Sequence, residues 1–80
     1  MKLPRDLSGS ELAKSLAVFG YQITRQSGSH IRLTTTEKGV HHITIPAHNP
    51  LKTGMLSAIL NDVAQHFNLT RDELLRRLFE

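Results

Sequence analysis

The chain has 80 residues, a mass of 9.0 kDa and no cysteine, which excludes a disulfide framework and a thiolate zinc site. Its 39% hydrophobic and 21% charged residues are typical of a folded globular domain and exclude a disordered chain. The formal net charge is +3, which points weakly towards a polyanionic partner.

Targeting and membrane signals are missing from the sequence. No apolar run approaches the roughly 20 residues that span a bilayer. The first residues, Met1–Asp6, lack the apolar stretch of a signal peptide. We therefore expect one domain over residues 1–80, located in the cytoplasm and without a membrane partner.

The positive charge is concentrated in the middle of the chain. Residues 12–61 carry five cationic side chains against the single carboxylate of Glu37, a net charge of +4. These cations are Lys14, Arg25, Arg32, Lys38 and Lys52. Residues 62–80 carry a net charge of −1, from three arginines against four carboxylates. If the chain binds nucleic acid, we expect its middle segment to make the contacts.

The first predicted element is a helix over residues 9–19. Ser8 and Glu11 form a capping box, in which the hydroxyl and the carboxylate each accept a backbone N–H. Leu12, Leu16 and Phe19 then fall on one helical face. Gly20 supplies the left-handed residue that ends a helix.

Three strands are predicted next, over residues 21–26, 30–35 and 41–45, because apolar and polar residues alternate there. Residues 37–39 form a three-residue hairpin loop with Gly39 at the position that needs a positive φ. Pairing Thr36 with Val40 then sets Ile31 opposite Ile45 and Leu33 opposite Ile43. His30 falls beside Pro46 at the open end of this hairpin.

Two helices complete the chain. Residues 52–67 place Leu56, Ile59, Leu60, Val63 and Phe67 on one stripe, with Asn68 as the C-cap. Thr70 and Glu73 form a second capping box before a helix over residues 71–79. The predicted fold is α+β, with one face of a three-stranded antiparallel sheet covered by helices.

The alternation of residues assigns each strand residue to one face of this sheet. The covered face is expected to hold the apolar strand residues Ile23, Ile31, Leu33, Ile43 and Ile45. The open face is expected to be polar and basic, with Gln22, Thr24, Gln26, His30, Arg32, Thr34, His42 and Thr44.

The segment Ser27–His30 is the best candidate for chemistry. Gly28 allows close approach of a ligand to the backbone, and the serine hydroxyls and N–H groups suit phosphate oxygens. His30 follows on the open side, where an imidazole can exchange a proton near neutral pH. The alternative is an ordinary polar turn. Ser27 and Ser29 have no acidic partner in the sequence that would activate a nucleophile.

Two other patterns favour structural interpretations. The sequence His41-His42-x5-His48 is a poor metal set, because adjacent strand residues point to opposite faces. We expect no metal and no cofactor. The segment Lys52–Met55 could hold an anion at a helix start, but the local sequence favours an ordinary charged first turn.

Five segments in order resemble the HicA toxin family, the small mRNA interferases of bacterial toxin–antitoxin pairs. The resemblance covers about residues 8–78. The segments are Ser10-Glu11-Leu12 with Leu16 and Gly20-Tyr21; Arg25-Gln26-x-Gly28-Ser29-His30; Ile43-Thr44-Ile45-Pro46-x-His48; Leu51-Lys52-x-Gly54-x-Leu56-x-x-Ile59-Leu60; and Leu69-Thr70-x-Asp72-Glu73-Leu74.

The resemblance implies a fold like that of double-stranded-RNA-binding domains, with an extra short C-terminal helix. It also implies that His30 is the catalytic residue of a metal-independent endoribonuclease acting on mRNA. The proton for the leaving oxygen would then come from water or from a second group such as His42. We expect the RNA to contact Arg25, Gly28, Ser29, Arg32, Lys38 and Lys52. We expect a monomer when free, and a hetero-oligomer with a HicB-type antitoxin.

Two other functions fit the same residues. A non-catalytic RNA-binding module would use the basic open face equally well, but would have no need of an imidazole at position 30. An inactive remnant would keep only its binding to the antitoxin. The residue His41, on the opposite strand face from His30, is expected to be dispensable for activity.

Overall fold

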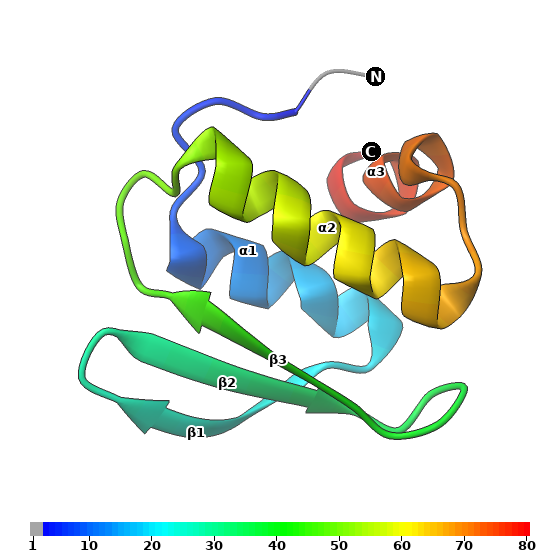
Figure 1. Cartoon of the computed structure of the whole chain (residues 1–80), viewed down its shortest axis with the longest axis horizontal. Coiled ribbons are helices and arrows are strands. Elements are labelled where there is room, and N and C mark those ends of the chain that lie inside the picture. Colours follow the sequence, from blue (N-terminus) through cyan, green and yellow to red (C-terminus); the bar gives the residue numbers. More distant parts are fainter. Residues whose placement is uncertain (1–2) are drawn as a thin grey trace.

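The computed structural model describes residues 3–80, and Met1 and Lys2 of the expected domain lie outside them. The elements run in the order α-β-β-β-α-α (Figure 1), which confirms the predicted fold. They are α1 (Gly9–Ser15) with a 3-10 turn η1 (Leu16–Phe19), β1 (Gln22–Ser27), β2 (His30–Thr35), β3 (His41–Pro46), α2 (Thr53–Phe67) and α3 (Arg71–Phe79). No helix in this range is long and apolar enough to cross a membrane.

Both predicted capping boxes form. The Ser8 Oγ accepts the Glu11 N–H at 3.1 Å, and the Glu11 carboxylate accepts the Ser8 N–H at 3.0 Å. The Thr70 and Glu73 pair repeats this arrangement at the start of α3. Gly20, with a φ of 81°, ends the first helical segment as predicted. Hydrogen bonding close to the helix ends therefore decides where these helices begin and end.

The β2–β3 hairpin has the predicted register. Ile31 lies opposite Ile45, Leu33 opposite Ile43, and His30 opposite Pro46. The ladder ends at the Thr35 and His41 pair, one pair before the predicted loop. Gly39 has a φ of 100°, as the hairpin prediction requires.

Helices α1 and α2 lie on the same face of the sheet, whose strand order is β1-β2-β3 (Figure 1). Helix α1 packs over β2 and β3, and α2 packs over β3. One apolar cluster fills the space between the layers, and it includes Leu12, Leu16, Ile31, Leu33, Ile45, Leu60 and Val63. The opposite face of the sheet is left open.

Strand β1 departs from the prediction in two ways. A bulge at Thr24 shifts its register, so that Ile23 pairs with Leu33 while Arg25 pairs with Arg32. Because directly opposite residues share a face, Arg25 projects on the open face, and Gln26, opposite Ile31, does not. Ile23 shares the side of Leu33 but is 55% exposed, because neither helix reaches over β1. The prediction that Ile23 is a core residue was wrong.

Candidate nucleic-acid interface

The turn between β1 and β2 carries the segment that the sequence singled out. Ser27 pairs with His30, so Gly28 and Ser29 form a two-residue turn. Gly28 has a φ of 56°, and glycine is preferred at the first position of one of the two common turns of this length. No atom lies within 4 Å of where a Gly28 side chain would project. The backbone at this turn is therefore open to a ligand.

The turn is anchored to the segment that follows β3. The Ala47 N–H donates to the Ser29 carbonyl at 2.6 Å, and the Gly9 N–H donates to the His48 carbonyl at 2.9 Å. A side chain at Gly9 would collide with the Pro46 carbonyl. These contacts join the tip of the β1–β2 hairpin to the segment that follows β3, and that segment to the start of α1.

His30 is the first residue of β2 and is exposed on the open face. Its cross-strand neighbours are Ser27 on β1 and Pro46 on β3. Within residues 3–80 its side chain makes no hydrogen bond, ion pair or ring contact. The imidazole is thus accessible to a substrate and to solvent.

Cationic and hydroxyl side chains follow His30 along the open face. Arg25 and Arg32 lie opposite each other one row further along the strands. Beyond them the Thr34 Oγ1 lies 2.8 Å from His42 Nδ1 and 3.0 Å from Thr24 Oγ1. The strand residues assigned to this face include no carboxylate. The face suits a polyanion.

The six residues expected to contact RNA are only partly brought together. Arg25, Gly28, Ser29 and Arg32 accompany His30 on one hairpin. Lys38 is in the β2–β3 loop at the other end of the sheet (Figure 1). Lys52 is the N-cap of α2, in the helix layer and not on the open strand face.

His42 is too far from His30 to act on the same phosphate. It lies opposite Thr34, four residues along β2 from His30. At about 3.3 Å per residue, the separation along the strand is ~13 Å. A second proton-transfer group for chemistry at His30 must therefore be sought elsewhere.

A second cluster of titratable side chains, which sequence reasoning missed, joins β3 to α2. The Tyr21 hydroxyl lies 2.7 Å from His41 Nδ1, and His41 Nε2 lies 3.2 Å from Asp62 Oδ1. A carboxylate only accepts, so His41 Nε2–H donates to Asp62, and Nδ1 on the other side of the ring meets the Tyr21 hydroxyl. Burial raises the pKa of Tyr21, and the nearby Asp62 carboxylate raises it further.

His66 extends this cluster. Its ring stacks on His41 with centroids 4.4 Å apart, and its Nε2 donates to the Glu37 carbonyl at 2.9 Å. These contacts tie the β2–β3 loop to α2. Replacing His41 would disturb this packing, so the exposed His42 is the better control for His30.

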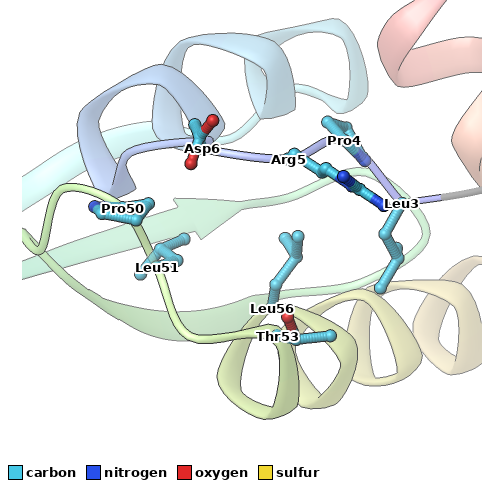
Figure 2. A pocket seen from close by; sticks show the side chains of 8 residues that line it. All are labelled: Leu3, Pro4, Arg5, Asp6, Pro50, Leu51, Thr53 and Leu56. Carbon is cyan, nitrogen blue, oxygen red and sulfur yellow. The ribbon is translucent and has the colours of Figure 1, made fainter.

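A pocket beside the start of α2 is set apart from the open face (Figure 2). It is lined by Leu3, Pro4, Arg5, Asp6, Pro50, Leu51, Thr53 and Leu56. Five of its eight lining residues are apolar, and its two charged residues, Arg5 and Asp6, have opposite signs. Lys52 is not among its lining residues, so the pocket gives no support to an anion site at this helix start.

Among residues 3–80 no three histidine, aspartate or glutamate side chains are grouped to hold a metal ion. The structure is thus a small α+β domain with a basic open sheet face and an exposed histidine at the start of the central strand. A model of the family described as the HicA toxin of bacterial toxin–antitoxin systems matches residues 9–64. The chain belongs to the HicA toxin family and is the toxin of such a system. No curated protein and no solved structure matches it.

Proposed function

We propose that the chain is a metal-independent endoribonuclease that cleaves mRNA at the open face of its sheet, with His30 as its catalytic residue. The observation that carries the proposal is the exposed His30 imidazole at the anchored β1–β2 turn, one row from two arginines and with no side-chain partner among residues 3–80. The whole chain, residues 1–80, is proposed to act as one domain.

In this mechanism His30 takes the proton of a ribose 2′-OH. The resulting oxygen attacks the adjacent phosphorus, the bond to the 5′ oxygen breaks, and water supplies the proton to that leaving oxygen. The products are a cyclic phosphate and a free 5′-OH. One positioned base typically contributes about 10²–10⁴-fold, so a slow enzyme is expected.

Charge develops on the phosphate oxygens during this reaction, and cationic or N–H groups near His30 would stabilise it. The open backbone at Gly28 and Ser29 adjoins His30 at the turn and would contact this phosphate, while Arg32, one row further along β2, adds positive charge nearby. Lys38 and Lys52 would contact RNA outside the reacting bond, because they belong to the far loop and to the helix layer.

The partner of the toxin is proposed to be a HicB-type antitoxin with an acidic contact surface that covers His30. Such a surface would complement the carboxylate-free strand face and block access of RNA. The free chain is proposed to be a monomer that forms a hetero-oligomer with the antitoxin.

The test compares two exposed histidines of the open face. His30→Ala should abolish cleavage of single-stranded RNA and growth arrest, while His42→Ala retains both. Neither side chain fills the core, so both variants should keep the wild-type circular dichroism spectrum and unfolding midpoint. Cleavage by the wild type should persist in excess chelator and should fail on DNA, which lacks the 2′-OH.

Three results would contradict the proposal. An active His30→Ala protein would remove the imidazole from the mechanism, and chelator-sensitive cleavage would require a metal. Wild-type protein that binds RNA but never cleaves it would favour the alternative, a non-catalytic RNA-binding module of the same fold.

A further inference from the structure

Two arginines lie opposite each other on neighbouring strands of the sheet. Arg25 and Arg32 are cross-strand partners on β1 and β2, and both are exposed. Like charges directly opposite each other destabilise a sheet. Within residues 3–80 neither arginine has a carboxylate partner, since the ion pair found there joins His41 to Asp62. The local fold thus leaves two cations side by side.

The bulge in β1 is what brings the two arginines together. Strict alternation would put Arg25 on the covered side with Ile23, but Thr24 is left without a cross-strand partner and Arg25 moves to the open face. The Thr24 Oγ1 bonds the Thr34 Oγ1 at 3.0 Å, which holds the extra residue in place. Bulges often occur beside active sites, where they redirect a side chain.

The arginine pair lies one row from His30 on the same face. Arg32 is two residues beyond His30 on β2, so the two rows are about 6.6 Å apart. This spacing is close to that of neighbouring phosphates along an extended nucleic-acid strand. A strand that follows β2 with one phosphate at His30 would bring the next phosphate to the arginines.

We infer that Arg25 and Arg32 form a clamp for one phosphate of single-stranded RNA, the phosphate next to the one cleaved at His30. The inference rests on the proposed function for the identity of the ligand. Planar guanidinium groups bind phosphate oxygens through two parallel hydrogen bonds. The bound phosphate would also relieve the repulsion between the arginines. The clamp therefore sets the path of the RNA along β2.

The first experiment removes one phosphate charge at a time. It uses a short oligoribonucleotide that the wild type cleaves at one bond, with a neutral methylphosphonate at each phosphate around that bond in turn. At one neighbouring position kcat/KM should fall about tenfold, which is the effect of losing ~1.4 kcal/mol of binding. In the double variant Arg25→Gln/Arg32→Gln the same substitution should have almost no further effect, whereas in the control Arg76→Gln on α3 it should keep its full effect.

A second measurement needs no cleavage. In the His30→Ala protein, a methylphosphonate at the same position should weaken binding of these oligoribonucleotides. Adding both Arg25→Gln and Arg32→Gln should make binding insensitive to that methylphosphonate. The salt dependence of RNA binding should show that the two arginines neutralise one phosphate. Replacing both arginines should make the negative slope of log K against log salt less steep by about 0.7, the value for one single-strand phosphate, and not by twice that amount.

Failure of the clamp and failure of the proposed ribonuclease activity would give different results. If no RNA is cleaved but the binding results hold, the proposed function fails and the clamp remains. Fully additive effects of the double arginine variant and the methylphosphonate at every position, or a doubled loss of salt slope, would overturn the clamp while leaving His30 catalysis intact.

Discussion

The two edge strands of the sheet, β1 and β3, differ in how far they are buried. Strand β3 lies under α1 and α2 and buries Ile43 and Ile45, whereas every residue of β1 is exposed. Leu33 of β2 lies between Ile43 on one side and Ile23 on the other. The covered edge supplies core residues, and the uncovered edge carries a bulge and one row of charged side chains. Stability and binding are thus assigned to different edges of one small sheet.

The largest expected effect tests this comparison with matched isoleucines. Leu33→Ala and Ile43→Ala should each lower the free energy of unfolding by about 2–5 kcal/mol, because they open cavities in the core. Ile23→Ala should change it by less than ~0.5 kcal/mol, because its side chain is 55% exposed against 5% for Ile43. Urea denaturation of the three variants measures this. Equal losses at Ile23 and Ile43 would mean that β1 is covered after all.

An intermediate effect concerns the antitoxin. Charge reversal by Arg32→Glu, on the open face, should weaken the complex with the antitoxin at least tenfold, or ~1.4 kcal/mol. Arg76→Glu, on α3, should leave the affinity nearly unchanged. Titration calorimetry with the purified antitoxin gives both values. If the two variants bind equally well, inhibition occurs away from the open face.

The smallest effect concerns the capping box at the start of α1, one of the helices that cover β3. The pKa of Glu11 is lowered chiefly by the Ser8 backbone N–H that its carboxylate accepts, and next by the Ser8 hydroxyl. A lowered folded-state pKa adds stability above the unfolded value, about 4.3, and this stability is lost as pH falls through the folded pKa. Glu11→Gln should therefore flatten the acid side of the stability curve. The pKa of Glu73 is lowered in the same way by Thr70. An unchanged curve of stability against pH in the double variant Glu11→Gln/Glu73→Gln would contradict this account.

Much of the fold followed from local sequence. The capping boxes at Ser8 and Thr70 placed two helix starts, because their hydrogen bonds span only three residues. Period-two alternation and the Gly39 loop set the β2–β3 register, since a shift of one residue would expose Ile31 and Leu33. His30 was assigned to the open end of this hairpin for the same reason, and it lies there.

Tertiary structure alone decided the rest. Whether Ile23 is buried depends on how far the helices reach across the sheet, and they stop before β1. The Thr24 bulge, which aligns Arg25 with Arg32, depends on the partner strand and leaves no mark in the alternation of β1. The Tyr21, His41 and Asp62 chain joins residues from three segments. Local hydrogen bonding and periodicity can be read from sequence, whereas coverage and cross-strand alignment arise only when separate segments pack together.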